Sequence, residues 1–264
     1  MTPVITFTSD FGLEDWFVGV VHGVIHELCP GARIVDLTHA IPPGDVARAA
    51  FVLEAACGDF PDGTVHLAVV DPGVGTSRRA IAVRARGQRF VGPDNGVLEW
   101  ALGDPKAECR ELTETRFFRS DVSRTFHGRD VFAPVAAHLA RGAKFEELGR
   151  VVRDPVRLRH PEPRVENGAL IGEVMFVDRF GNALTNVTAA ALAAAFRSVP
   201  EAELEVDVAG RTVRGIARSY GDAPIGTLVA IVGSSGRLEL AEVGGHASSR
   251  FGIGARDAVR VRAA

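Results

Sequence analysis

The sequence predicts an α/β fold, with an N-terminal three-layer α/β domain built on a mostly parallel sheet and a small C-terminal β-barrel domain. In roughly the first half, strand-like and helix-like segments alternate, which is typical of a parallel sheet covered by helices. Residues 64–70 are almost wholly apolar, as in a strand buried on both faces. After a stretch rich in proline and arginine, short strands with glycine turns dominate, which favours a small barrel.

The N-terminal elements follow from apolar runs and from the residues that end them. Pro30 and Gly31 stop the first helix, Asp45 caps the second, and Arg86 and Gly87 form the turn of a strand pair. The expected strands are residues 4–8, 33–37, 64–70, 80–85 and 88–91, and the expected helices are residues 14–28, 46–56, a short one near Val97, and 131–139.

The chain changes character near Gly149, and the prolines at positions 155, 161 and 163 indicate a linker. We therefore expect an α/β domain over residues 1–154, a linker over 155–166 and a β-barrel-like domain over 167–264. Strands are expected at residues 170–177, 183–187, 203–208, 211–216, 228–232, 238–240 and 258–261, with one helix over 189–195.

Composition narrows the class of protein. Of 264 residues, 46% are hydrophobic and 24% charged, which is typical of a soluble globular chain. The net charge of −3, without a basic run, argues against nucleic acid and anionic membrane as partners. Three distant cysteines argue against disulfides and a structural zinc site, and no apolar run reaches the roughly 20 residues that span a bilayer. We expect a cytoplasmic protein.

Carboxylates follow three of the expected strands. Asp10, Asp71 and Asp94 (with Asn95) each come where a strand ends, next to glycines, and open α/β sheets bind ligands outside the carboxyl ends of their strands. Each one alone is also a common loop or helix cap. Together they predict a ligand site at this edge.

Residues 71–79 place a carboxylate and two guanidinium groups on one compact loop. The loop lacks the G-K-[ST] and GxGxxG patterns of nucleotide-binding loops. Arg78 or Arg79 could keep Asp71 ionised, although a surface salt bridge is the plainer interpretation. His127, between an aromatic residue and Gly128 at a helix start, is the histidine whose setting best suits proton transfer.

Two polar turns mark the C-terminal half. Residues 178–186 offer Asp178, the aromatic Phe180 and the amide of Asn182, which suit a ligand with an ammonium group and a purine ring. Ordinary β-turns use the same residue types. Residues 233–236 form a second small turn containing Ser234 and Ser235.

Six ordered segments together resemble one family. They are residues 8–12 (TSDFG), 70–75 (VDPGVG), 92–96 (GPDNG), 126–130 (FHGRD), 178–182 (DRFGN) and 233–236 (GSSG). In this combination the chain is similar to the adenosine-forming S-adenosyl-L-methionine (SAM) hydrolases, also called SAM hydroxide adenosyltransferases, over essentially its whole length. The SAM-dependent fluorinase and chlorinase belong to the same superfamily.

The resemblance implies a homotrimer that binds SAM between the N-terminal domain of one subunit and the C-terminal domain of the next. It implies hydrolysis to adenosine and methionine without a metal or other cofactor, with Asp71, Arg78 and His127 as the catalytic set and Arg79 as the competing arginine. Positive charge from Arg78, and from His127 if its ring is protonated, would favour hydroxide, and the sequence leaves the protonation of Asp71 and His127 open. The implied substrate-binding residues are Asp10, Phe11, Asp15, Asn95, Phe126, Gly128, Asp178, Phe180, Asn182, Ser234, Ser235, Glu239 and Gly244.

Within that set, the resemblance implies that Asp10 binds the ribose diol, that Asp178 binds the methionine ammonium and that Asn182 binds the adenine edge. Ser234, with Ser235, contacts the methionine end, and Phe126 and Phe180 pack against the nucleoside. Two departures stand out. The turn at Val243 lacks the family's usual asparagine next to Gly244. Ser235 stands where the halogenases have arginine, which leaves open how the methionine carboxylate is held.

Three other functions compete. A SAM-dependent halogenase is the nearest, but the halogenases have tyrosine at the position of Asp71, lack His127, and in the fluorinase have serine in place of Gly128. A metal-dependent phosphoesterase would use Asp10, Asp71, Asp94, Asn95 and His127 as ligands. A SAM or adenosine sensor would bind ligand without turnover.

Overall fold

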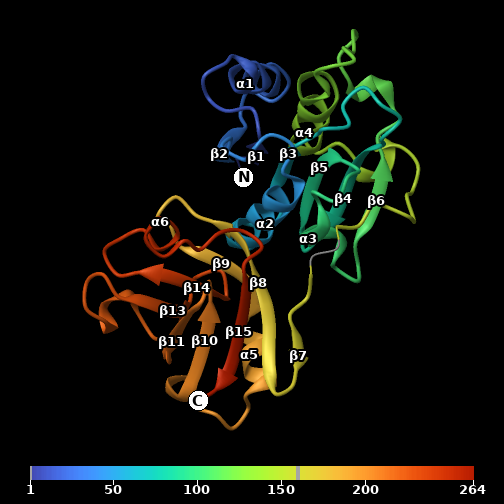
Figure 1. Cartoon of the computed structure of the whole chain (residues 1–264). Coiled ribbons are helices and arrows are strands. Elements are labelled where there is room, and N and C mark those ends of the chain that lie inside the picture. The colour runs from blue at the N-terminus through green and yellow to red at the C-terminus, as the bar shows by residue number, and fades with distance from the viewer. Residues whose placement is uncertain (1, 159–160) are drawn as a thin grey trace. The chain divides into compact units, whose positions relative to one another are not determined.

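The computed structural model describes residues 2–158 and 161–264, and the chain divides into two compact units, residues 1–158 and 159–264. Unit 1 has two hydrophobic clusters and unit 2 has one. The predicted fold class is confirmed, because unit 1 is a layered α/β structure and unit 2 a nearly closed β-barrel (Figure 1). Among the described residues, no helix is long and apolar enough to cross a membrane.

The sheet of unit 1 has six strands in the order β2-β1-β3-β5-β4-β6. Strands β2, β1, β3 and β5 are parallel, whereas β4 is antiparallel to both β5 and β6. The carboxyl ends of β1, β3 and β5 therefore lie at the same edge. The strands are β1 (Val4–Ser9), β2 (Arg33–Thr38), β3 (Val65–Val69), β4 (Ala80–Ala85), β5 (Gln88–Pro93) and β6 (Glu108–Glu111).

Helices cover both faces of this sheet. On one face α1 and α4 lie side by side over side chains such as Phe7 and Leu67; on the other, α2 and α3 cover side chains such as Phe90 (Figure 1). Every residue of β3 is buried, as expected for a strand between two helical layers. The helices are α1 (Phe17–Leu28), α2 (Val46–Ala56), α3 (Glu99–Leu102) and α4 (Ala133–Ala140), with short η1 (Cys57–Asp59), η2 (Thr115–Phe117), η3 (Gly128–Phe132) and η4 (Phe145–Leu148).

Two predicted helix starts were wrong. Helix α1 begins at Phe17 rather than at residue 14, because residues 13–16 form exposed bends after the turn at Gly12, whose φ is +69°. The helix expected at Val131 begins three residues earlier, as a single π-helical turn at Gly128 that continues into α4. Such π-helical turns are rare in proteins, and those that occur are often found at functional sites.

The segment expected to be a linker, residues 155–166, is partly structured. Val156 N donates to Asp94 Oδ1 at 2.7 Å and Leu158 N to Glu99 Oε2 at 2.9 Å, so its start is bonded to unit 1. Its end forms β7, which pairs with β8 in unit 2. Residues 159 and 160, in the middle of this segment, lie outside the described residues.

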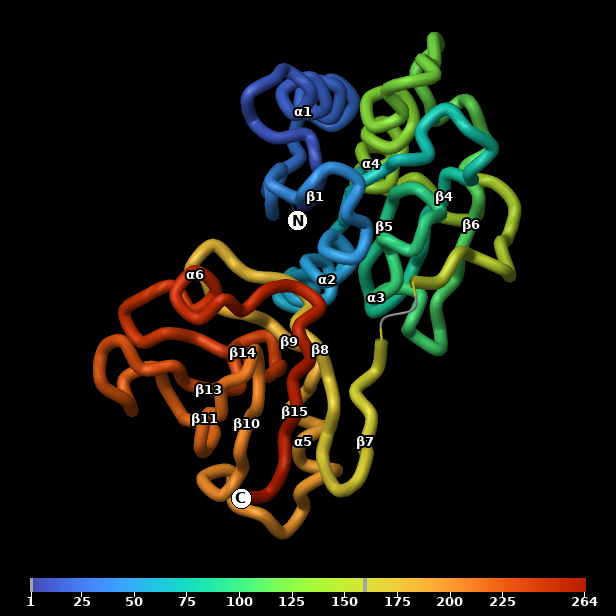
Figure 2. Tube along the Cα trace, in the orientation of Figure 1, coloured from blue at the N-terminus to red at the C-terminus, as the bar shows by residue number. Residues whose placement is uncertain are grey.

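Unit 2 is a nine-stranded sheet with the order β11-β10-β15-β8-β9-β14-β13-β12, and β7 pairs with β8. Its pairs are antiparallel except β12 with β13 (chain path in Figure 2). Its elements are β7 (Arg164–Glu166), β8 (Ala169–Val177), β9 (Ala183–Thr188), α5 (Ala189–Ala195), η5 (Glu201–Glu203), β10 (Leu204–Val208), β11 (Arg211–Arg214), β12 (Ile216–Ala217), η6 (Tyr220–Asp222), β13 (Leu228–Val232), β14 (Arg237–Glu242), α6 (Ala247–Phe251) and β15 (Ala258–Ala263).

Gly215 explains how the barrel closes. A single strand was expected over residues 211–216, but Gly215 has φ of +75°, which a glycine adopts without strain, and splits it into β11 and β12. Strand β11 pairs with β10 and β12 with β13, so the two ends of the sheet are joined by one residue. Leu204, Val206, Leu238 and Leu240 lie in the single core cluster that this closure encloses.

Candidate active site

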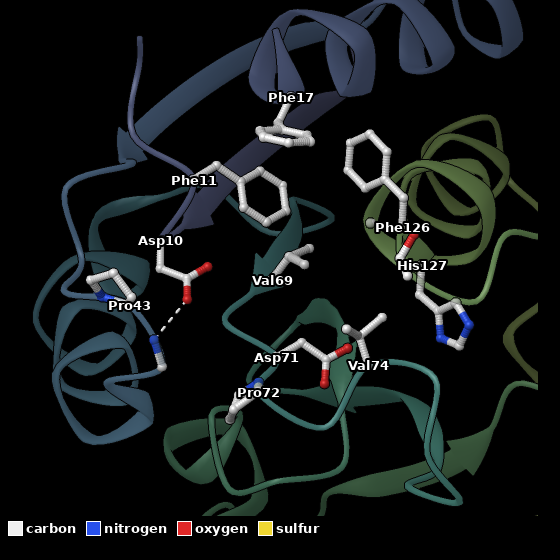
Figure 3. A pocket seen from close by; sticks show the side chains of 13 residues that line it. Asp10, Phe11, Phe17, Pro43, Val69, Asp71, Pro72, Val74, Phe126 and His127 are labelled. Atoms are coloured by element: carbon white, nitrogen blue, oxygen red, sulfur yellow. Dashed lines mark hydrogen bonds between the residues drawn. The ribbon is translucent and has the colours of Figure 1, made fainter. Parts of the chain in front are cut away.

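A pocket of about 480 Å³ lies at the carboxyl edge of the unit 1 sheet (Figure 3). Its lining comes from the segments that follow β1 and β3, from the turn before α2, and from the segment leading into η3. Six predicted site residues line it: Asp10, Phe11, Asp71, Phe126, His127 and Gly128. The predicted site at this sheet edge therefore corresponds to a real cavity.

Aromatic rings form one wall of this pocket. The ring centroids of Phe11, Phe17 and Phe126 lie 5.3–5.9 Å apart, in edge-to-face or tilted contacts. Gly128 permits this packing, since a Cβ there would lie 3.3 Å from Phe11 Cζ and 3.4 Å from Phe126 Cε2. The wall suits the flat, apolar part of a ligand.

Asp10 is held by the turn before α2. Its Oδ2 accepts a hydrogen bond of 2.8 Å from the backbone N–H of Gly44 (dashed in Figure 3). Gly44 has φ of +74°, and its neighbour Pro43 also lines the pocket. This hydrogen bond fixes the orientation of the Asp10 carboxylate at the pocket.

Arg78 connects the other two predicted catalytic residues. Its Nε donates to both oxygens of Asp71, at 2.9 and 3.1 Å, and its Nη2 donates to Asp71 Oδ2. The same Nη2 lies 2.8 Å from His127 Nδ1. The side chains of Arg78 and Asp71 are only 11% and 6% exposed, and the guanidinium lies over the Phe132 ring at 5.1 Å. This network brings the three side chains together.

The contact with Arg78 fixes the protonation state of His127. A guanidinium can only donate hydrogen bonds, so His127 Nδ1 must be the acceptor, and the ring proton sits on Nε2. Burial, and then the charge of Arg78, lower the pKa of His127 below its usual value, although Asp71 and Asp130 oppose this. The protonation state of His127, which the sequence left open, is therefore assigned: the ring is neutral at neutral pH.

Arg79, the competing arginine, points into a different set of contacts. Its Nε donates to Asp94 Oδ2 at 2.7 Å, and its two terminal nitrogens donate to Asp154 Oδ1 and to the Asp154 carbonyl oxygen. Of the two arginines between which the sequence left the choice open, Arg78 is the one that contacts Asp71 and His127. Arg79 instead ties β4 to the segment around residue 154.

Asp94 and Asn95 serve the framework of unit 1. Asp94 is buried and accepts from both Arg79 and the Val156 backbone. Asn95 donates to the Val70 carbonyl oxygen at 2.8 Å and accepts from Val97 N, which joins the ends of β3 and β5. Neither residue lines the pocket, and Asp15 is exposed outside it.

A second pocket, of about 850 Å³, lies in unit 2. It is lined by all seven site residues predicted for this half of the chain: Asp178, Phe180, Asn182, Ser234, Ser235, Glu239 and Gly244. These residues come from the β8–β9 turn, the β13–β14 turn, β14 itself and the segment after it. The two polar turns of the sequence are thus brought to one cavity.

Asp178 is preorganised by its own turn. Its Oδ1 accepts from the backbone N–H groups of Phe180 and Asn182, at 2.8 and 2.9 Å, and its Oδ2 accepts a longer bond from the Asn182 side chain. Phe180 is 75% exposed, so its ring is free to cover a ligand. The turn holds a carboxylate and an amide ready at the pocket.

A second carboxylate, that of Glu239, lies in the same pocket. Burial, and then the charge of Asp178, raise the pKa of Glu239, while a hydrogen bond from Tyr220 opposes this. A Cβ on Gly233 would lie 1.2 Å from Glu239 Oε1, so a larger residue there would force the Glu239 carboxylate to move. Two neighbouring carboxylates make the pocket attractive to a cationic ligand group.

The sequence analysis missed several lining residues. In unit 1 these include Phe17, Pro43, Gly44, Val69, Val74 and Thr125, and in unit 2 Arg218, Ser219, Tyr220, Ile231 and Glu242. The Pro-Pro-Gly turn at residues 42–44 could have indicated a pocket lining, but the sequence analysis considered this segment only as the start of a helix. Tyr220 is the single tyrosine of the chain and sits in a polar loop, which was a further unused signal.

These features define a class: a two-domain protein whose α/β unit and β-barrel unit each carry a preorganised, polar and aromatic small-molecule pocket. Comparison with known families gives its identity. Residues 5–149 match the SAM hydroxide adenosyltransferase N-terminal domain, and residues 172–260 match its C-terminal domain. The chain belongs to the SAM hydroxide adenosyltransferase family, which confirms the resemblance seen in the sequence.

Individual relatives agree with this assignment. A curated (R)-S-adenosyl-L-methionine hydrolase of Salinispora tropica is 45% identical, over 99% of this chain and 98% of its own length. A fluorinase of Actinoplanes sp. is 32% identical over 70% of this chain and 72% of its own length. A crystal structure of an uncharacterised conserved protein from Thermotoga maritima has a TM-score of 0.91 and 40% identity, covering 98% of this chain and 99% of that one.

The contacts of Asp94 predict a stabilising role for this residue. Asp94→Asn removes a charge-assisted hydrogen bond from a buried site and is expected to lower the free energy of unfolding by about 2 kcal/mol in urea denaturation. Asp154→Asn is the matched control, because that side chain is 84% exposed and an ion pair so exposed to solvent contributes little to stability. An Asp94→Asn variant of unchanged stability that had lost its ligand affinity would place Asp94 in the site instead.

Proposed function

We propose that this chain hydrolyses SAM to adenosine and L-methionine, by in-line attack of a water oxygen on C5′ without a metal or other cofactor. The observation that carries the proposal is the hydrogen-bonded set of Asp71, Arg78 and His127 at the pocket of unit 1. The family membership supports the same reaction, since the relative from Salinispora tropica carries the hydrolase name.

The substrate roles follow the chemistry of each pocket. Asp10, fixed by Gly44, takes the ribose diol, and Phe11 and Phe126 pack against the nucleoside. In the unit 2 pocket, Asn182 takes the adenine edge and Asp178 the methionine ammonium, for which its carboxylate is already oriented. Asp15 and Asn95 line neither of these two pockets, and their predicted contacts with the substrate stay predictions.

The methionine carboxylate needs a partner, since Ser235 stands where the halogenases have arginine. Arg218 can take this role. It is the one arginine among the described residues that line the unit 2 pocket, and it lies in the loop after β12. The Ser235 hydroxyl is buried and makes no hydrogen bond within the described residues. We assign the carboxylate to Arg218 and Ser235, with Ser234 beside them.

The proposed chemical step uses groups that are already in place. Asp71 is held by Arg78, and the remaining lone pairs of its carboxylate accept a hydrogen bond from the attacking water. The neutral His127 donates its Nε2–H to the same water and so orients it. The water oxygen bonds to C5′, the C5′–S bond breaks with its electron pair going to sulfur, and the water proton passes to Asp71 and then to solvent.

The leaving group makes a metal unnecessary. The sulfonium of SAM departs as the neutral thioether of methionine, so no developing negative charge on it needs a Lewis acid. The metal-phosphoesterase alternative requires Asp10, Asp71, Asp94 and His127 to share an ion. Within residues 2–158 and 161–264, these side chains do not form a group close enough to do so.

Halogenation is disfavoured by the same geometry. A carboxylate at position 71 repels a halide ion, and this one is locked in place by Arg78. A serine at position 128, as in the fluorinase, would press its Cβ against Phe11, Phe126 and Val69 here.

The sensor alternative predicts the same contacts with bound SAM, and it differs from the hydrolase in predicting no turnover.

Incubation with SAM in water enriched in heavy oxygen, with EDTA present, tests the reaction. We expect adenosine labelled at its 5′-hydroxyl, together with methionine, and chloride should produce no chloroadenosine. Asp71→Asn and His127→Ala should each lower kcat by about 10²–10⁴-fold, whereas His26→Gln, exposed on α1, should leave it unchanged. Intact SAM that remains bound would favour the sensor instead.

The lowered pKa of His127 predicts an acidic limb in the rate profile. Protonation would abolish the Nδ1 acceptor and set an imidazolium against Arg78, so kcat should be constant above neutrality and fall as pH drops through a value below 6.5. Glutamine can supply both an acceptor and a donor, so His127→Gln should retain partial activity and lose this inflection. An inflection that persists in His127→Gln would assign the titration to another group.

The homotrimer implied by the resemblance is also part of the proposal and predicts complementation. If each site combines the unit 1 pocket of one subunit with the unit 2 pocket of the next, inactive Asp71→Asn and Asp178→Asn chains should restore activity when refolded together. Random trimers would contain about a quarter of wild-type sites. Recovery near that level supports shared sites; no recovery in a confirmed mixed trimer would show that each chain carries a complete site.

A further inference from the structure

A cluster of two histidines and a carboxylate lies outside both pockets. His22 is on α1, Asp36 is in β2, and His39 follows that strand. One ligand atom from each lies within 4.8 Å of the others. The shared atom is Asp36 Oδ1, which is 2.9 Å from His22 Nε2 and 3.0 Å from His39 Nε2.

His39 is the side chain that points to a ligand. Its side chain is only 2% exposed, and the partner of its Nε2 among the described residues is Asp36 Oδ1, 3.0 Å away. Its other nitrogen, Nδ1, lies 2.7 Å from Ser9 Oγ. With Ser9 Oγ accepting its Nδ1–H, the ring would present its Nε2 lone pair to the carboxylate, and a cation bound between them would satisfy both.

We propose that His22, Asp36 and His39 form a binding site for one divalent transition-metal ion of the zinc class. Imidazole nitrogens with one carboxylate oxygen suit Zn²⁺ and its neighbours, whereas Mg²⁺ and Ca²⁺ prefer oxygen ligands. Ligand atoms about 2.0 Å from a tetrahedral zinc ion are about 3.3 Å apart, so the observed spacings need only small outward movements.

The surroundings have the features of a metal site with an open position. His22 and Asp36 are 28% and 38% exposed, so solvent can supply the fourth ligand. Ser9 supports the buried histidine as an outer hydrogen-bond partner, and the Phe7 ring packs against His39 with centroids 4.6 Å apart. Asp36 lies in strand β2, His39 directly follows that strand, and His22 lies on helix α1.

A bound ion would join α1 to β2 and to the loop that follows β1. Ser9 precedes Asp10 in this loop, its Oγ also accepts from Phe11 N, and the His39 carbonyl oxygen accepts from Gly12 N at 2.9 Å. The ion would therefore brace the segment that carries Asp10 and Phe11 without touching the pocket itself. The expected metal-free chemistry is unaffected, because this site plays no part in it.

The test is calorimetric titration of the chelator-treated full-length chain with Zn²⁺, and separately with Mg²⁺. We expect one Zn²⁺ per chain, no Mg²⁺ binding, and a rise in Tm with Zn²⁺. His22→Gln should weaken Zn²⁺ binding by at least about 10-fold and remove the Tm rise. It changes a partly exposed side chain, so folding is preserved; Asp36→Asn is the second variant.

His26→Gln is the matched control, because His26 lies one turn further along the same helix and is exposed. It should bind Zn²⁺ like the unchanged chain. Absence of Zn²⁺ binding would overturn the proposal. So would binding of equal strength in the His22→Gln and His26→Gln variants, since the ion would then sit elsewhere on the surface.

Discussion

The guanidinium of Arg78 is the group on which the site of unit 1 depends. Its N–H groups donate hydrogen bonds to both Asp71 and His127, and the side chains of Arg78 and Asp71 are almost fully buried. Removing one member of such a buried ion pair typically costs about 3–5 kcal/mol, so the pair persists only while each partner is satisfied. The protonation state of His127 follows from this one contact.

The sheet makes that contact possible. Asp71 follows β3, Arg78 precedes β4, and His127 precedes the π-helical turn η3. Gly75, with φ of +77°, lets the loop between Asp71 and Arg78 approach Arg124, where a Cβ would lie 2.4 Å from the Arg124 carbonyl oxygen. Glycine is therefore required at this point, and the loop is short enough to bring Arg78 back to Asp71.

The two pockets have complementary chemistry. The pocket of unit 1 combines aromatic rings with an anchored carboxylate. The pocket of unit 2 combines three carboxylates, an amide, an arginine and a buried hydroxyl that has no hydrogen-bond partner among the described residues. The former suits a ribose diol and a reacting carbon, and the latter suits an adenine edge and an amino acid end. SAM carries both kinds of group, which is why the family assignment and the local chemistry agree.

Most strands and helices, and most residues of the two pockets, could be predicted from the sequence. Strand periodicity and polar residues at strand ends are local patterns. Strand β4 and helices α2 and α5 have the predicted bounds. What failed depends on distant contacts. Asp94 resembled a site residue, but its partners Arg79 and Val156 lie 15 and 62 positions away. The protonation state of His127 could not be predicted, because its partner Arg78 lies 49 positions away in the sequence.

The state of His127 is the central claim, and nitrogen NMR of the uniformly ¹⁵N-labelled chain tests it directly. The His127 signals can be assigned by their loss in His127→Ala. At neutral pH we expect a neutral ring with an unprotonated Nδ1 that accepts a hydrogen bond and a protonated Nε2, persisting below pH 6.5. A doubly protonated ring at neutrality, or a proton on Nδ1, would contradict the account, because Arg78 could then not hold His127 as described.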